Sequence, residues 1–332
     1  MAELRWNPLL KDWVMIASHR QGRPQMPKDW CPFCPGSGRV PDTYDVHKYD
    51  NDFPALSPEP PEPDSSGNGY YKVEKAFGKC EVILYSPEHN IHLSELSVPH
   101  VRKLVDLWTE RYSELKNDPR IRYVFIFENR GEMVGVTMPH PHGQIYGYPF
   151  LPKRMEQELE AAIEHRSAQG ECIYCRMLQE EQTGDRLIFE NDSFVAFLPF
   201  FVEYPYGIYL MSKEHRSSLE ELSETEKTDL ADALISATTT LDGLFDKPFP
   251  YLMCVYQNPV NGTDHRQDSH LHIKFFPPLR SEDKQKFNAS SETGAGAHCN
   301  PCSPEEKAAE LRNSYMKNVS ERRKTYGLQT SD

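Results

Sequence analysis

The stretch Ser86-Pro-Glu-His89 recurs as Ser212-Lys-Glu-His215, 126 residues further along the chain. Each copy is followed by Glu-Leu-Ser and then by a helical pattern with an apolar stripe, over residues 98–116 in the first case and 224–245 in the second. A β-rich run and a His-x-His motif come after each helix. A unit that recurs in the same order at the scale of a domain predicts one fold used twice.

Strands are expected before and after each of these helices. In the first unit they cover residues 80–85, 122–127 and 144–150, in the second 207–211, 251–256 and 273–276, and further helices are expected over 153–168 and 304–319. The last strand of each unit follows the His-x-His motif, which reads His140-Pro-His142 and then His270-Leu-His272. Antiparallel strands backed by one helix per half make an α+β arrangement. We therefore predict a duplicated α+β fold with pseudo-twofold symmetry, whose halves are residues 1–152 and 153–332.

The composition limits the class of partner. Of the 332 residues, 38% are hydrophobic and 26% charged, which suits a folded globular chain. Asp and Glu number 50 and Lys and Arg 37, a formal net charge of −13. A chain this acidic is a poor candidate for wrapping nucleic acid or for lying on an anionic membrane. No stretch approaches the ~20 apolar residues of a membrane-spanning helix. Because the first residues also lack an apolar signal core, we expect a cytoplasmic protein.

Six of the eight cysteines fall into three C-x2-C pairs, at residues 31–34, 172–175 and 299–302. In a chain without an export signal, this spacing favours metal binding or redox chemistry over disulfides. Residues 30–36, Trp-Cys-Pro-Phe-Cys-Pro-Gly, resemble a zinc knuckle with a tight turn around the metal. Metal binding is therefore favoured over redox chemistry for the first two pairs. The third pair lies in a Gly/Ala-rich tail, where two incidental thiols are as plausible as a functional pair.

The repeat extends each of the first two pairs to a set of four metal ligands. Tetrahedral zinc takes Cys and His side chains, and each unit offers two of each kind in the same order. The two sets are Cys31, Cys34, His89 and His140, and Cys172, Cys175, His215 and His270. Four protein ligands leave no position open for water, so we expect two structural zinc ions per chain. The alternative is that His89 and His215 are helix-capping or core histidines.

The second histidine of the first His-x-His is the candidate nucleophile. If His140 binds zinc, His142 is available for another task. A neutral imidazole can attack phosphorus when its other ring nitrogen donates to an acceptor, and we expect the carbonyl of His140 to be that acceptor. Gly143 is expected to let the backbone approach a ligand, and Gln144 can donate to an oxyanion. Ile and Lys follow the second motif instead, so that copy is expected to keep the metal ligand and to lack the chemistry.

These motifs carry a family resemblance. The string His-Pro-His-Gly-Gln at residues 140–144, with Cys31-Pro-Phe-Cys34 and Ser86-Pro-Glu-His89 upstream, resembles the galactose-1-phosphate uridylyltransferases of the histidine-triad superfamily. The resemblance covers nearly the whole chain. Further matches are residues 5–8, residues 18–24, Asn51-Asp-Phe53, Phe127-Glu-Asn129 and Gly135.

The resemblance implies two histidine-triad-like halves and a ping-pong transfer of UMP. His142 would attack the α-phosphorus of UDP-glucose and release glucose 1-phosphate, after which galactose 1-phosphate would accept the uridylyl group. Gln144 matches the residue that hydrogen-bonds the transferred phosphoryl group. The residues that match substrate contacts are Arg20, Arg23, Asn51, Asp52, Phe53, Asn129, Gly135, Thr137, Lys286 and Glu292. The family's C-terminal tail reaches the active site of the neighbouring subunit, which implies a homodimer.

Two departures from the family pattern bear on this prediction. Some members bind a second metal, iron, through a Glu and three His. Glu158 and His272 match two of those positions, but Gln257 and Lys274 stand at the other two, so this site is not expected to form. In the tail, Lys286 and Glu292 still match, but Ser291 and His298 stand in place of the usual Tyr and Gln. The E-x-G-x-G form of residues 292–296 resembles a plant relative that transfers adenylyl groups.

Three functions therefore stay open on the sequence. The leading one is a hexose-1-phosphate uridylyltransferase. The second is a nucleoside-diphosphate-sugar phosphorylase or adenylyltransferase that uses the same histidine. The third is a zinc-stabilised binding module for nucleotide or nucleic acid, without catalysis. Arg20 and Arg23 have an alternative of their own, a solvated surface pair in place of phosphate ligands.

Overall fold

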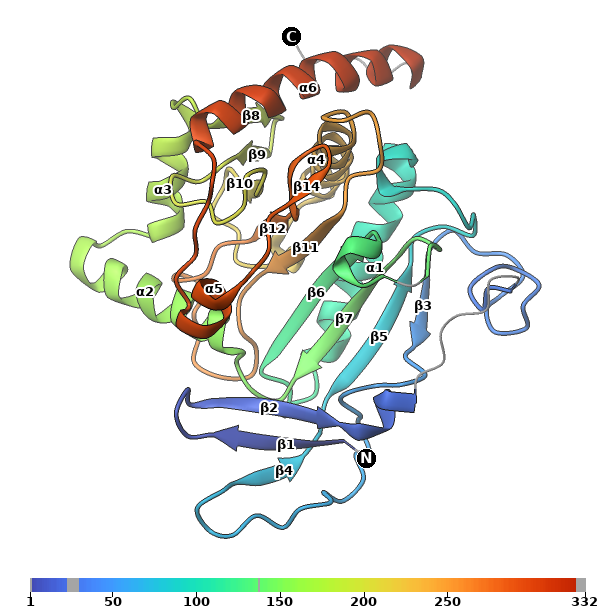
Figure 1. The fold of residues 1–332 in the computed structure, drawn as a ribbon, viewed down its shortest axis with the longest axis vertical. Coiled ribbons are helices and arrows are strands. Elements are labelled where there is room, and N and C mark those ends of the chain that lie inside the picture. The colour runs from blue at the N-terminus through green and yellow to red at the C-terminus, as the bar shows by residue number, and fades with distance from the viewer. Residues whose placement is uncertain (1, 23–29, 137, 327–332) are drawn as a thin grey trace.

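A nine-stranded antiparallel sheet forms the centre of the computed structural model, which describes residues 2–22, 30–136 and 138–326 (Figure 1). The strand order in this part of the chain is β3-β5-β7-β6-β11-β12-β10-β9-β8. The strands are β3 (His47–Asp50), β5 (Lys79–Leu84), β6 (Tyr123–Arg130), β7 (His142–Tyr148), β8 (Leu187–Glu190), β9 (Phe194–Phe197), β10 (Tyr209–Ser212), β11 (Tyr251–Tyr256) and β12 (His272–Phe276).

The strand order confirms the predicted duplication. Outward from the middle of the sheet, β6, β7 and β5 of the first half correspond to β11, β12 and β10 of the second. The two central strands pair antiparallel, with Glu128 opposite Met253 and Phe127 opposite Cys254. Because these strands satisfy one another's backbone groups, neither half exposes an unpaired edge at the junction. The fold is α+β, as expected, and the halves share one continuous sheet.

Two long helices cover one face of this sheet and lie behind it in Figure 1. They are α1 (Val98–Leu115) and α4 (Glu224–Asp242), which pack against each other. Ser97 caps the first by accepting a hydrogen bond from the amide of His100, and Ser223 forms a capping box with Glu226 in the second. The predicted stripe of the first helix is buried against the sheet and forms part of the main core: Val101, Leu104, Val105, Trp108, Tyr112 and Leu115.

Other elements surround this core. The helices are α2 (Lys153–Gln169), which links the halves, α3 (Ile173–Gln182), α5 (Ser290–Ala295) and α6 (Pro304–Tyr326). The 3-10 turns are η1 (Ser18–Gly22), η2 (Leu93–Glu95), η3 (Glu132–Val134) and η4 (Leu219–Glu221). Two small sheets join β1 (Ala2–Asn7), β2 (Asp12–Ala17) and β4 (Val73–Lys75), and β13 (Leu279–Ser281) with β14 (Lys284–Gln285). Within the described ranges, no helix is both long and apolar enough to span a bilayer.

Alternation along β7 separates the core from the site. Ile145 points to the helices and is fully buried in the main core. His142, Gln144 and Tyr146 belong to the opposite face, because side chains alternate along a strand. On that face, Tyr146 joins a second, smaller apolar cluster. The face of the sheet away from α1 and α4 therefore carries the candidate catalytic residues.

Candidate active site and metal-binding groups

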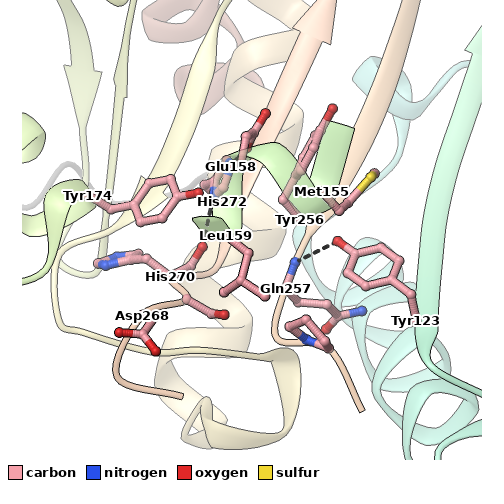
Figure 2. A pocket seen from close by; sticks show the side chains of 12 residues that line it. Tyr123, Met155, Glu158, Leu159, Tyr174, Tyr256, Gln257, Asp268, His270 and His272 are labelled. Carbon is pink, nitrogen blue, oxygen red and sulfur yellow. Dashed lines mark hydrogen bonds and ion pairs between the residues drawn. The ribbon is translucent and has the colours of Figure 1, made fainter. Parts of the chain in front are cut away.

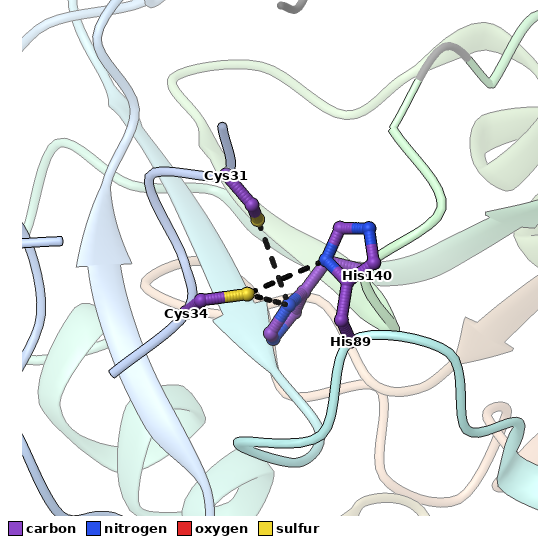
Figure 3. Close-up of side chains that lie close together, drawn as sticks. All are labelled: Cys31, Cys34, His89 and His140. Atoms are coloured by element: carbon purple, nitrogen blue, oxygen red, sulfur yellow. Dashed lines mark hydrogen bonds between the residues drawn. The ribbon is translucent and has the colours of Figure 1, made fainter. Parts of the chain in front are cut away.

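The first Cys/His set comes together as predicted (Figure 3). The ligand atoms of Cys31, Cys34, His89 and His140 all lie within 4.8 Å of one another. The Nδ1 of His140 is 3.7 Å from each of the two cysteine sulfurs, and the Nδ1 of His89 is 3.4 Å from Cys34 Sγ. Tetrahedral zinc, with Zn–S and Zn–N bonds of about 2.3 and 2.0 Å, would separate sulfur and nitrogen by about 3.5 Å. The four residues fit such an ion.

The surroundings of His140 prepare it to bind through Nδ1. Its Nε2 lies 2.9 Å from the carbonyl of Ser86, to which it donates, so the lone pair stays on the nitrogen that faces the cysteines. Burial lowers the pKa of His140 to about 4, which favours the neutral ring that a metal requires. The cysteine loop is held in place by Phe33, which packs with Val82 and Leu84 of β5.

The second set repeats this arrangement. The ligand atoms of Cys172, Cys175, His215 and His270 again all lie within 4.8 Å of one another. Cys175 Sγ is 3.3 Å from His215 Nδ1 and 3.6 Å from His270 Nδ1. The Nε2 of His270 lies 2.8 Å from the carbonyl of Ser212, the counterpart of Ser86. This clustering favours metal binding over the alternative that His89 and His215 only cap helices or fill the core.

The repeated serine is a functional position that the sequence reasoning missed. In both halves the residue that opens the S-x-E-H stretch supplies the carbonyl that orients a histidine of the candidate metal group. Ser86 Oγ also accepts a hydrogen bond from the amide of Glu88 and shapes the turn. The serine occurs in both copies of the repeat, which could have drawn attention to it. Every residue type has a backbone carbonyl, however, so the serine itself does not predict this role.

His142 is tied directly to the first metal group. Its Nδ1 lies 2.8 Å from the carbonyl oxygen of His140, the acceptor that we predicted. Donation to that oxygen puts the ring proton on Nδ1 and the lone pair on Nε2. The ring is half-buried, with Phe33 at a centroid distance of 6.0 Å. A metal bound through His140 would therefore fix the orientation of the candidate nucleophile.

Gln144 follows on the same face of β7. Its Oε1 accepts a hydrogen bond from the hydroxyl of Tyr146, at 3.3 Å, which orients the carboxamide. Burial raises the pKa of Tyr146 to about 12, and the nearby charge of Arg20 opposes that rise. The prediction for Gly143 was wrong in its cause: a Cβ there would lie 2.2 Å from Tyr85 Oη, on the core side. The glycine is needed for packing and not for access to a ligand.

A cavity of about 230 Å³ adjoins His142. Its lining combines the apolar Leu93, Met138 and Phe249 with the polar or charged His92, Glu128, Asn129 and Arg130. The lining also includes Gly131, Glu132, Val136, Pro139, Pro141 and Pro250. Gly135 closes η3 with a φ of 83°, a left-handed conformation that glycine adopts without strain. The space suits a small ligand held beside the imidazole.

Comparison with known proteins decides the family. Residues 1–152 match the galactose-1-phosphate uridyl transferase N-terminal domain, and residues 154–324 match the C-terminal domain. The chain belongs to the galactose-1-phosphate uridylyltransferase family. It is 40% identical to galactose-1-phosphate uridylyltransferase of Thermotoga maritima over 94% of this chain and 98% of that protein. The Rattus norvegicus enzyme is 33% identical, over 93% of this chain and 86% of that protein.

Solved structures agree with this assignment. A uridylyltransferase structure superposes with a TM-score of 0.88 at 32% identity and covers 95% of this chain and 99% of its own. An ADP-glucose phosphorylase from Arabidopsis thaliana with bound ADP-glucose gives a TM-score of 0.73 at 24% identity, covering 94% and 99%. The second similarity shows the shared fold alone.

The other family-matched positions that the structure describes include a turn after β3 and part of the tail. Asn51 Oδ1 accepts from the amide of Phe53 at 2.9 Å and forms a turn. Asp52 is exposed and held by Arg39, at 2.7 Å, a partner that we had not predicted. Arg20 approaches Tyr146, as described above. The predicted residues Arg23 and Thr137 lie outside the described residues.

Lys286 and Glu292 pair with each other in the C-terminal tail. Their charged groups are 3.5 Å apart, and the ammonium of Lys286 lies 5.0 Å from the ring centre of Tyr204 in the second half. Neither residue lines the cavity beside His142. The third cysteine pair follows in the same tail, with Cys299 exposed and Cys302 half-buried.

Proposed function

We propose that this chain is a hexose-1-phosphate uridylyltransferase that works through a covalent uridylyl–His142 intermediate. The observation that carries the proposal is His140, which joins a metal-binding group through Nδ1 and accepts the Nδ1–H of His142 through its carbonyl. Family membership supplies the substrates, UDP-glucose and galactose 1-phosphate. The location we propose is the cytoplasm.

In the first step, His142 Nε2 attacks the α-phosphorus of UDP-glucose. The bond to the bridging oxygen breaks, and glucose 1-phosphate leaves with the electron pair. The phosphorylated ring carries a positive charge because Nδ1 keeps its proton, and the His140 carbonyl stabilises that charge. In the second step, a phosphate oxygen of galactose 1-phosphate attacks the same phosphorus, the P–N bond breaks, and UDP-galactose leaves.

Other residues would bind and orient the substrates. Gln144 would donate its amide to an oxygen of the transferred phosphoryl group, where charge develops. Arg20 and Arg23 would bind phosphate, and Asn51, Asp52 and Phe53 the uridine. Asn129, Gly135 and Thr137 would contact the nucleotide. Lys286 and Glu292 would reach the site of the neighbouring subunit in a homodimer.

Zinc is the metal that we propose for both Cys/His groups. Two thiolates and two imidazoles suit its tetrahedral preference, and four protein ligands make the role structural. Bound zinc would hold the loop of residues 31–34 against the strand that begins at His142. We further propose residues 1–152 and 153–332 as the two domains, and neither nucleic acid nor membrane as a partner.

The test is transfer of label from sugar nucleotide to protein. UDP-glucose labelled at the α-phosphate should give an acid-labile adduct on the wild-type chain and none on His142→Gly. The substitution His165→Ala, on α2, is the control and should retain the adduct. Label from ADP-glucose in place of UDP-glucose would favour the phosphorylase or adenylyltransferase. Tight UMP binding without any adduct would reject covalent catalysis.

A further inference from the structure

One hydroxyl group contacts all three segments that carry the ligands of the first metal group. Tyr44 Oη lies 2.7 Å from the carbonyl oxygen of Phe33, which stands between the two cysteines of the loop. It lies 3.0 Å from the carbonyl of Ser86, which opens the stretch that ends at His89, and 3.1 Å from Nε2 of His140. A residue that is not itself a ligand therefore connects every segment that supplies one.

The donors and acceptors around Tyr44 suit a neutral His140 that binds metal through Nδ1. A hydroxyl has one proton to donate and two lone pairs that accept. The Nε2–H of His140 is shared between the carbonyl of Ser86, at 2.9 Å, and the hydroxyl oxygen of Tyr44. The hydroxyl proton then points to the carbonyl of Phe33, the shortest of its three contacts. His140 held in this way keeps the lone pair of Nδ1 toward the cysteine sulfurs.

The ring of Tyr44 is anchored by the apolar cluster beneath the cysteine loop. That cluster contains Phe33, Val82 and Leu84, and the half-buried Tyr44 packs against it. Phe33 thus contacts Tyr44 through the cluster and accepts its hydrogen bond through the backbone. Because packing holds the ring, a phenylalanine at position 44 would keep the apolar contacts and lose only the polar ones.

The second metal group holds its buried histidine in a different way. Nε2 of His270 lies 2.8 Å from the carbonyl and 3.0 Å from the hydroxyl of one residue, Ser212. That hydroxyl also lies 3.4 Å from the carbonyl of Leu271, beside the same histidine. The two groups therefore share their ligand types and the serine carbonyl, and they differ in the second oxygen at the histidine.

The halves also differ in what else holds the strand that follows this histidine. His272 is 3% exposed, and the rings of Tyr174 and Tyr256 each lie at a centroid distance of 4.9 Å from it (Figure 2). His142 is half-buried and borders a cavity. Packing fixes His272, whereas His142 is oriented by its hydrogen bond to the carbonyl of His140. The first half therefore depends more on whatever keeps its metal group together.

We propose that Tyr44 is a positioning residue for the first metal group, and that its hydroxyl slows loss of the bound ion by joining the three ligand segments. Hydrogen-bond partners of metal ligands typically change metal affinity by about 10–100-fold. This effect rests on the zinc proposed for the group. A second effect, a fixed orientation of His142 through the carbonyl of His140, rests on the proposed function.

The test follows the reactivity of the cysteines in the full-length protein loaded with zinc. A thiolate that binds zinc is protected from iodoacetamide, so its alkylation in the presence of a chelator reports loss of the ion. We expect Tyr44→Phe to speed alkylation of the cysteines at 31–34 by about 10–100-fold, and to leave those at 172–175 unchanged, as measured by peptide mass spectrometry. Tyr206→Phe, which removes a hydroxyl 2.6 Å from Glu310, is the matched control and should change neither pair.

Ser212→Ala should reverse the pattern, because it removes the hydroxyl at His270 and keeps the carbonyl. A general loss of stability would expose both cysteine pairs, so equal acceleration of the two pairs in Tyr44→Phe would overturn the proposal. No acceleration at residues 31–34, or no protection of them by zinc in the wild type, would overturn it as well.

A second measurement applies if Tyr44→Phe is recovered with a single zinc ion. Protection of the cysteines at 31–34 is then followed at graded free zinc, and a midpoint equal to that of wild type is the contrary result. Tyr44→Phe should also slow labelling of His142 by UDP-glucose. Labelling of the wild type is measured apart from the alkylation rates, so failure of the proposed function would be seen separately.

Discussion

Replacing Gly143 with alanine should destabilise the chain and slow the reaction. The added Cβ would lie 2.2 Å from Tyr85 Oη and 3.0 Å from the carbonyl oxygen of Phe127, well inside van der Waals contact. Tyr85 is 1% exposed, so it cannot swing into solvent. Overpacking of this kind costs about 1–3 kcal/mol. Because relief requires β7 to shift outward, His142 moves with it, and a displacement of ~1 Å can lower kcat by about 100-fold.

Urea unfolding and the exchange rate between UDP-glucose and glucose 1-phosphate measure the two effects. A second substitution, Tyr85→Phe, removes the clashing oxygen and should recover at least about 1 kcal/mol in the double variant. Gly184→Ala is the matched control, because its Cβ would meet the nearest atom at 3.4 Å, and it should stay within about 0.5 kcal/mol of wild type. Additive effects of Gly143→Ala and Tyr85→Phe would refute the steric explanation.

Three further substitutions test the metal group, a buried acid and a buried ion pair. Cys34→Ala should lower bound zinc from two ions to one per chain, measured by elemental analysis. Burial raises the pKa of Glu128 from 4.5 to about 7, so the stability it contributes is full below pH 4.5 and is lost as pH rises through 7. Glu128→Gln should remove that loss, which is roughly 3 kcal/mol in the free energy of unfolding. The measurement is urea unfolding of both proteins at pH 5 and at pH 8. Arg111→Met should cost about 3–5 kcal/mol, because it leaves the fully buried Glu81 without the guanidinium 2.8 Å away.

Each of these three predictions has an outcome that would contradict it. Two metal ions in Cys34→Ala would remove that residue from the ligand set. Equal slopes of stability against pH in wild type and Glu128→Gln would show that this carboxyl ionises normally. Lys103→Met, which breaks an exposed ion pair, is the control for Arg111→Met and should cost less than about 1 kcal/mol. If Arg111→Met and Lys103→Met lost similar amounts of stability, burial of the ion pair would not be the cause.

The candidate metal groups and the hydrogen bond from His142 to the carbonyl of His140 were predictable because both follow from short sequence motifs. A C-x2-C pair, a Glu-His and a His-x-His recur in one order, so duplication supplied a second observation of every ligand. The acceptor for His142 lies only two residues away, and local geometry decides such a contact. The amphipathic stripes of α1 and α4 followed from helical periodicity in the same way.

Long-range contacts account for what was missed. The sheet of β1, β2 and β4 joins residues about 70 positions apart, and nothing local in Val73–Lys75 names its partner. Helix α3 begins between the two cysteines of the second metal set, which spacing alone does not reveal. The role of Gly143 was wrong for a similar reason: Tyr85, from the neighbouring strand's end, takes the space of its missing side chain.

The sequence by itself determined the duplicated α+β fold and predicted the two Cys/His sets and the choice of His142, because each depends on residue types at fixed spacing. Only the tertiary structure decided which copy is open. His142 borders a cavity, whereas His272 lies under tyrosine rings with Glu158 beside it. The two histidines share a local geometry, and the difference comes from the residues packed against His272. These are Tyr174 of α3, Tyr256 of β11 and Glu158 of α2, and the contact of Glu158 with Lys274 joins residues more than 110 positions apart. Contacts between residues so far apart in the sequence depend on how the elements pack, and no local sequence pattern predicts them.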